Sequence, residues 1–170
     1  MRKLQGFHSL QILDLQDNLL NQSSAFELSG SLAQMKNLKH LILRNCNIGS
    51  TYASMIFQGL IVNKGLEVLD MSNNQVSDNV TPALIKLINE KRDFQTLTLG
   101  LRSNQISQQG YNRIKDALLK QVSGRRGFRE SGIVYREEIK IQLAGNPIMV
   151  KDFQSQLDAL AQTFSGMMLI

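Results

Sequence analysis

The segment Leu66-Glu67-Val68-Leu69-Asp70-Met71-Ser72-Asn73-Asn74-Gln75-Val76 decides the fold of this 170-residue chain. Its apolar positions recur 28 and 56 residues earlier, and its second asparagine, Asn74, corresponds to Cys46 and Asn18. The earlier copies are Leu10, Leu13, Leu15, Asn18 and Leu20, then Leu38, Leu41, Leu43, Cys46 and Ile48. A fixed internal period of this length indicates an array of stacked units.

Each unit divides into a strand and a helix. Apolar and polar residues alternate at Leu13-Asp14-Leu15-Gln16, as in a half-buried strand. The second half carries apolar residues four apart, which is the spacing of a helix face; the pairs are Leu28 and Leu32, Ile56 and Leu60, and Leu84 and Ile88. We expect the strands to form a parallel sheet, and the asparagine or cysteine after each strand to satisfy backbone groups at the turn.

Two later copies depart from the 28-residue period. The fourth, anchored by Asn104 and Ile106, lies 30 residues after the third, and we place the extra residues before or within the strand, as a bulge near Gly100. The fifth comprises Ile141, Leu143, Asn146 and Ile148 and lies 42 residues after the fourth. We interpret residues 123–137 as a basic insertion, residues 151–164 as a closing helix, and residues 165–170 as an apolar tail that packs under the last repeat or against a partner.

We call the recurring leucines and the asparagine or cysteine that follows them the ladder. The ladder, the 28-residue period and the Ala/Leu-rich helical half resemble the leucine-rich repeat family, in its ribonuclease-inhibitor-like intracellular subclass. The resemblance covers about residues 4–165 of the chain. It implies an α/β solenoid, a short horseshoe of about five strand–helix repeats with a parallel concave sheet and helices on the convex side. It also implies a role in binding, without naming the partner. We expect one domain, 1–170, in which residues 1–9 are the tail of a preceding or degenerate repeat whose uncapped edge allows self-association.

The composition of the chain limits the cellular compartments in which we expect it. The chain has a single cysteine, which excludes an intrachain disulfide framework, and its N-terminal segment is too polar for a secretory signal. No apolar run approaches the roughly 20 residues that span a bilayer. These features predict a cytoplasmic protein, including the cytoplasm of a host cell if the chain is a bacterial effector.

The residues that alternate with the buried leucines are expected to face outward on the concave side. The candidate partner-binding set is His40, Ile42, Arg44, Asp70, Arg102, Lys140 and Gln142. Arg44 and Arg102 stand out, because arginine is enriched at binding hot spots. The alternative is that these are ordinary solvated sheet residues.

A second candidate surface is the basic run within residues 111–129, which holds six basic residues and one acid, a net charge of +5 that equals the charge of the whole chain. Its central residues are Lys120, Arg125, Arg126, Phe128 and Arg129. Positive fields of this kind attract nucleic acid or anionic lipid, although a solvated loop after a helix is an equally simple reading.

We find no catalytic triad, metal-ligand spacing, phosphate loop or cofactor motif, so we expect no enzyme activity and no cofactor. The leading hypothesis is a protein-interaction module, acting alone or within a larger regulatory or receptor protein. A nucleic-acid or lipid binder and a GTPase-activating or other enzyme-regulatory role are the alternatives.

Overall fold

The computed structural model describes residues 9–63, 65–90, 97–125, 139–148 and 168–169. For residues 119, 121–125, 139–140 and 168–169 it describes the backbone alone. The predicted closing helix at 151–164, nearly all of the predicted tail segment at 1–9 and most of the predicted insertion at 123–137 lie outside these ranges.

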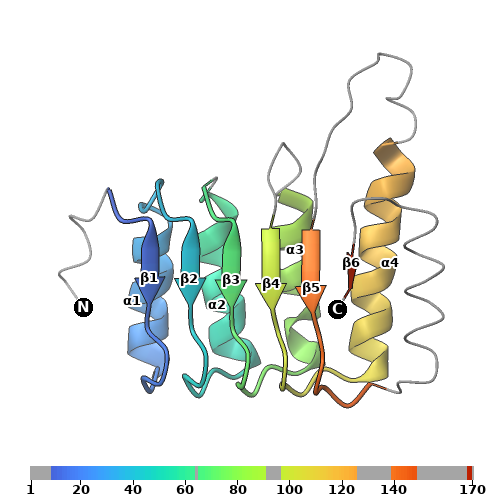
Figure 1. The fold of residues 1–170 in the computed structure, drawn as a ribbon, viewed down its shortest axis with the longest axis horizontal. Helices are drawn as coiled ribbons and strands as arrows, with labels where there is room; N and C mark the ends of the chain where they lie inside the picture. The colour runs from blue at the N-terminus through green and yellow to red at the C-terminus, as the bar shows by residue number, and fades with distance from the viewer. Residues whose placement is uncertain (1–8, 64, 91–96, 126–138, 149–167, 170) are drawn as a thin grey trace.

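Strands and helices alternate along the chain, as the repeat predicts (Figure 1). In order they are β1 (Ile12–Asp14), α1 (Gln22–Leu32), β2 (His40–Ile42), α2 (Ser50–Ile61), β3 (Val68–Asp70), η2 (Asp78–Val80), α3 (Thr81–Glu90), β4 (Leu97–Gly100), α4 (Gln108–Arg125), β5 (Ile139–Gln142) and β6 (Met168–Leu169). The six strands form one parallel sheet in sequence order. The last strand, β6, falls within the segment that the sequence analysis treated only as an apolar tail.

The strand register repeats the sequence period. Leu13 pairs with Leu41, Leu41 with Leu69, and Leu69 with Leu99. Pairing runs without interruption from β3 through β4 to β5, so the predicted bulge at Gly100 is absent. The two extra residues of the fourth copy therefore precede the strand, in the connection from α3 to β4.

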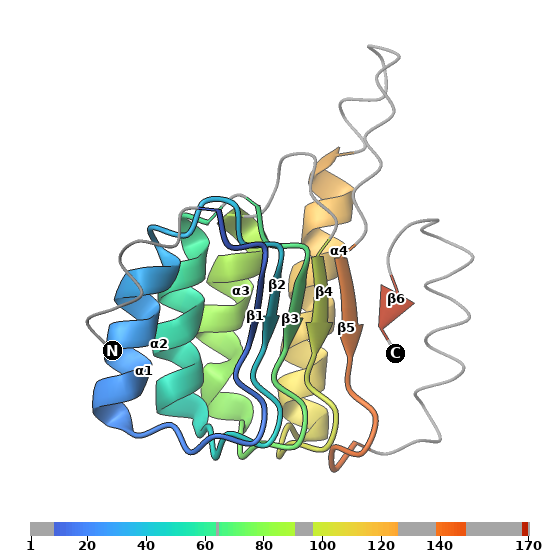
Figure 2. The same cartoon turned by 60° about the vertical axis from the view of Figure 1, so that its left-hand side comes forward.

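The core lies between the sheet and the helices. Helices α1 to α4 cover one face of the sheet, and the other face is open across β1 to β5 (Figure 2). The ladder residues of the three central repeats are buried, among them Leu41, Leu69 and Leu99. Stacking is what buries them, because one strand and one helix cannot shield both apolar faces alone.

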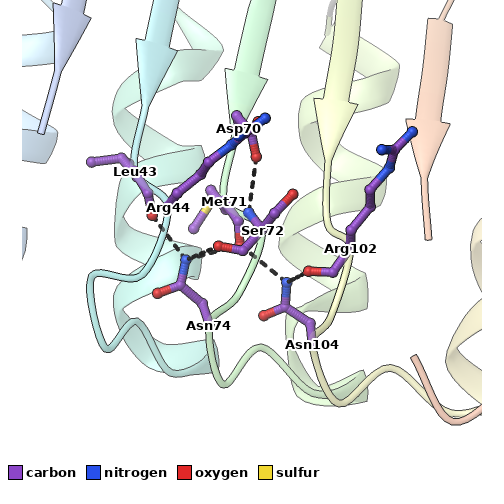
Figure 3. Close-up of polar contacts among 8 residues, drawn as sticks. All are labelled: Leu43, Arg44, Asp70, Met71, Ser72, Asn74, Arg102 and Asn104. Carbon is purple, nitrogen blue, oxygen red and sulfur yellow. Dashed lines mark hydrogen bonds and ion pairs between the residues drawn. The ribbon is translucent and has the colours of Figure 1, made fainter. Parts of the chain in front are cut away.

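The predicted role of the asparagine at the turn is confirmed after β3, β4 and β5, while Asn18 after β1 is exposed and bonds only its own turn. Asn74 Oδ1 accepts hydrogen bonds from the backbone N–H groups of Cys46 and Ile48. The Asn74 amide donates to the carbonyl groups of Leu43, Met71 and Ser72, which are drawn in Figure 3. Asn104 and Asn146 repeat much of this pattern one and two strands on. Each asparagine thus fastens its own strand to the one before it.

The residue before each ladder position has a left-handed backbone, which the sequence analysis did not anticipate. These residues are Asp17, Asn45, Asn73, Ser103 and Gly145, with φ angles of 60°, 51°, 56°, 52° and 76°. Asparagine, aspartate and glycine tolerate this region best, so their presence one residue before the ladder was a readable signal.

Helix packing on the convex side depends on small residues. A Cβ at Gly59 of α2 would collide with the backbone of Ser29 in α1, and the Ser29 hydroxyl donates to the Met55 carbonyl oxygen. Glycine and serine therefore let α1 and α2 approach closely enough for their strands to pair.

Candidate functional site

The open face of the sheet carries the residues that the sequence placed in the partner-binding set. Register aligns His40 with Val68, Thr98 and Lys140, and aligns Asp14 with Ile42, Asp70, Gly100 and Gln142. His40, Ile42, Asp70 and Gln142 are half-buried, whereas Arg44 and Arg102 are exposed. Lys140 is placed through its backbone in β5. The predicted set is thus one surface in the structure, although its role in binding stays a prediction.

Arg44 and Asp70 form an ion pair across β2 and β3. The Arg44 Nε and Nη2 atoms both lie 2.6 Å from Asp70 Oδ2, while Asp70 Oδ1 accepts a hydrogen bond from the Ser72 backbone N–H (Figure 3). Burial on its own raises the pKa of Asp70, but the hydrogen bonds from Ser72 and the Arg44 guanidinium together hold that pKa below its ordinary value. The sequence indicated Arg44 as a candidate hot-spot residue, and the structure shows that Arg44 already pairs with Asp70 within the chain.

Gly100 makes room for this pair. It is the β4 residue in register with Asp70. A Cβ at Gly100 would lie 2.6 Å from Asp70 Oδ1 and 3.2 Å from Ser72 Oγ, so any side chain there would displace the carboxylate. Gly100, which the sequence analysis connected with a bulge, therefore leaves the space that the Asp70 carboxylate occupies.

Arg102 occupies the position of Arg44 two repeats further along the chain. Arg44 follows Ile42 by two residues and binds Asp70, the residue in register with Ile42 on the next strand. Arg102 follows Gly100 by two residues, and the residue in register with Gly100 on the next strand is Gln142. Since Gln142 is neutral, the carboxylate is missing. In the described part of the chain no ion pair engages the exposed Arg102 guanidinium, which Figure 3 shows on the β5 side of β4.

Asp14 is the matching half at the other end of the sheet. It occupies the Asp70 position on β1, and its Oδ1 likewise accepts a hydrogen bond from the backbone N–H two residues on, at Gln16. Its side chain is exposed, and no described arginine reaches it. Nearby Asp17 is also acidic, and hydrogen bonds from Gln16 and Asn45 hold its pKa below the ordinary value.

A further ion pair joins the strands at their entry. Lys39 Nζ lies 2.6 Å from Glu67 Oε1, 28 residues away in the neighbouring repeat. This hydrogen bond lowers the pKa of Glu67. Because both side chains are about half exposed, the pair contributes little to stability and adds no net charge to the face.

The described part of the basic run lies in α4, on the helix side of the sheet (Figure 2). Lys120 is an exposed residue of α4, and Arg125 is the last residue of that helix, so α4 takes in the first residues of the predicted insertion. Arg126, Phe128 and Arg129 lie outside the described residues. The run and the open sheet face are therefore separate candidate surfaces.

Nothing in the described ranges gathers three metal-ligating side chains. Cys46 is buried in the ladder, its thiol donates to the Leu15 carbonyl oxygen, and burial raises its pKa. That environment is typical of a structural thiol and not of a nucleophile. No helix among the described residues is both long and apolar enough to cross a membrane.

Comparisons with known proteins agree with this architecture. The leucine-rich repeat family model matches residues 37–60 and 65–87, which are the second and third repeats. A search of curated proteins found no match. Among solved structures, the chain resembles leiomodin-1 actin-binding site 2, with a TM-score of 0.53 and 10% identity over 77% of this chain and 92% of that one. The leucine-rich repeat model thus accounts for two of the repeats, and the repeat spacing and the parallel sheet extend the same architecture to the other described repeats.

Proposed function

We propose that the chain is a protein-interaction module that binds its partner across the open face of the sheet, from β1 to β5. The observation that carries this proposal is the charge arrangement on that face, with one closed ion pair flanked by the exposed Asp14 and Arg102. The family match supports the proposal, because stacked repeats create extended concave binding surfaces.

A pull-down with two charge-reversed variants tests this proposal. Arg102→Glu alters the open face, and Arg113→Glu alters an exposed residue of α4 by the same change in charge. We expect Arg102→Glu to lose the partners that the unaltered chain captures, and Arg113→Glu to retain them. Mass spectrometry of the captured proteins gives the readout. If Arg113→Glu loses the captured partners and Arg102→Glu retains them, the binding surface lies on the helix side and the proposal is wrong.

Actin is a partner to test directly. The similar structure is titled as an actin-binding site, but at 10% identity the likeness concerns the fold alone. Co-sedimentation of the purified chain with filamentous actin, with Arg102→Glu and Arg113→Glu as the matched pair, decides whether actin is bound and by which face.

The basic run offers a competing surface for nucleic acid or anionic lipid. Binding of that kind falls steeply with salt and requires the charges of α4 and beyond. Retention of partner binding by a chain carrying Arg125→Gln and Arg126→Gln would separate the two surfaces.

A further inference from the structure

The open face holds one complete ion pair and two halves of the same pair. The register places Asp14 and Asp70 at one position of the repeat. It places Arg44 and Arg102 at another, two residues further along each repeat. Among the described residues, Asp70 and Arg44 pair with each other. Within the same residues no ion pair engages Asp14 on β1 or Arg102 after β4.

The charge of the face therefore changes sign along the solenoid. The outward positions of β1 and the turn after it include Asp14 and Asp17 and no base. Arg44 and Asp70 cancel each other at the centre. Arg102 follows β4, Lys140 lies within β5, and neither strand supplies an acid at these positions. Lys39 and Glu67 pair with each other and leave the gradient unchanged.

We propose, resting on the protein-binding function above, that the partner is a protein segment that crosses the strands and completes both half pairs, with a Lys or Arg at Asp14 and an Asp or Glu at Arg102. The repeat itself provides the template for each contact. Arg44 shows how a guanidinium reaches the Asp14-type carboxylate, and Asp70 shows where a carboxylate meets the Arg102-type guanidinium.

The geometry sets the spacing of the two charges on the partner. Neighbouring strands lie about 4.8 Å apart, and three to four strand intervals separate the two half pairs, which gives about 15–20 Å. An extended segment covers this distance in about five or six residues, at about 3.3 Å each. A helix needs about 10–13 residues, at about 1.5 Å each.

The neutral centre explains why such a segment would bind in one position along the face. An ion pair that is already closed offers no free charge, so charged residues of the partner gain nothing over β2 and β3. The two ends attract opposite charges, and charge complementarity of this kind fixes register and excludes partners of uniform charge.

Selection from a displayed library of random 12-residue peptides tests the inference. The purified chain should enrich peptides that carry a base and an acid about five or six residues apart if they bind extended, or about 10 residues apart if they bind as a helix. Asp14→Lys should reduce the enrichment of basic residues at least tenfold, and Arg102→Gln should do the same for acidic residues. Arg113→Gln on α4, which removes the same charge as Arg102→Gln, should enrich the same peptides as the unaltered chain.

A synthetic peptide from the selection then isolates one contact. Changing its acidic residue to the amide should weaken binding several-fold to the unaltered chain and leave binding to Arg102→Gln unchanged. Thermal unfolding followed by circular dichroism checks that each variant remains folded.

Two outcomes overturn the inference, and a face-blocking variant separates it from the proposed function. Val68→Arg places a bulky charge at the centre of the open face, on a half-buried position of β3. If Val68→Arg abolishes binding while Asp14→Lys and Arg102→Gln leave the peptide preference unchanged, the face binds protein but the half-pair inference is wrong. If no peptide is enriched, or if the enriched peptides also tolerate Val68→Arg, both proposals are wrong.

Discussion

The Arg44–Asp70 pair and the Arg102–Gln142 positions share one geometry and differ in one side chain. In both, the arginine lies two residues after the last residue of its strand. The position that it faces is the residue of the next strand in register with that last residue, which is Asp70 for Arg44 and Gln142 for Arg102. The first is a closed pair, whereas the second lacks the carboxylate. The backbone of a repeat protein thus offers the same contact in every unit, and a single side chain decides whether it is used internally or remains available.

The largest effect is expected from breaking the turn that holds the closed pair. Asn74→Ala removes five hydrogen bonds, three to the segment after β2 and two within the turn after β3, and leaves buried backbone groups without partners. We expect a loss of about 3–5 kcal/mol in the free energy of unfolding, measured by urea titration. Asn18→Ala is the matched control, since Asn18 is exposed and donates only to Leu15 and Gln16. An equal loss at the two positions would contradict the ladder's role.

Gly100→Ala places a methyl group in the space that the Asp70 carboxylate of the closed pair occupies. Its Cβ would lie 2.6 Å from Asp70 Oδ1, and Ser72 and Arg44 hold that carboxylate in place. We expect a loss of about 1–3 kcal/mol from overpacking. The same substitution at Gly30 in α1, where a Cβ meets no atom within 4 Å, should instead stabilise the helix by up to about 1 kcal/mol. Thermal unfolding compares the two variants, and a neutral Gly100→Ala would show that the carboxylate has room to move.

Asp70→Asn keeps the shape of the closed pair and removes its charge. Charge-assisted hydrogen bonds to Arg44 and Ser72 are weakened, and we expect a loss of about 1–2 kcal/mol on urea unfolding. Asp14→Asn is the control at the equivalent open position, where an exposed carboxylate accepts one backbone hydrogen bond. Its effect should stay below about 0.5 kcal/mol. Equal effects would mean that Arg44 adds nothing to Asp70.

The closed pair should also give the fold a dependence on acid pH. The folded-state pKa of Asp70 lies below the ordinary value, because Ser72 and Arg44 outweigh burial. Its contribution is therefore complete above the unfolded pKa, about 3.9, and is lost as the pH falls through the folded pKa. The stability difference between the unaltered chain and Asp70→Asn should be constant near neutral pH and shrink below about pH 4. If the stability difference between the two chains persists below about pH 4, the effect of Asp70→Asn does not come from the charge of the carboxylate.

The smallest effect should come from closing the open pair. Gln142→Glu supplies the missing carboxylate opposite Arg102, and an exposed pair of this kind contributes up to about 1 kcal/mol. A double-mutant cycle with Arg102→Gln measures the coupling between the two positions. If the half-pair inference is right, Gln142→Glu also weakens binding of acidic peptides, because Arg102 is then occupied. Stabilisation with no change in peptide binding would contradict it.

Much of the fold could be predicted from the sequence, because stacking forces it. The leucine spacing fixes which face of each strand is buried, and the period fixes the register, as the pairing of Leu41 with Leu69 confirms. The asparagine contacts were also predictable, since a turn leaves backbone groups that a buried amide must satisfy. The left-handed residues were missed, although Asn45, Asn73 and Gly145 carried the signal.

The state of the candidate site could not be predicted in the same way. The sequence placed Arg44, Asp70 and Arg102 on one face, but treated Arg44 and Arg102 as equals. Only the register shows that Asp70 lies opposite Arg44 and Gln142 opposite Arg102. Spacing along the chain predicts the register itself but not the ion pair, because Arg44 reaches Asp70 from a different repeat position and that contact depends on side-chain geometry.

The spacing of the leucines and asparagines was enough to predict the repeat, the buried faces and the parallel order of the strands, because stacking equivalent units buries apolar residues that recur at a fixed period. The tertiary structure decided which charges meet, because an ion pair depends on distances of a few ångströms between side chains 26 or 40 residues apart in the chain. That geometry makes Arg44 part of the scaffold and leaves Asp14 and Arg102 exposed on the open face.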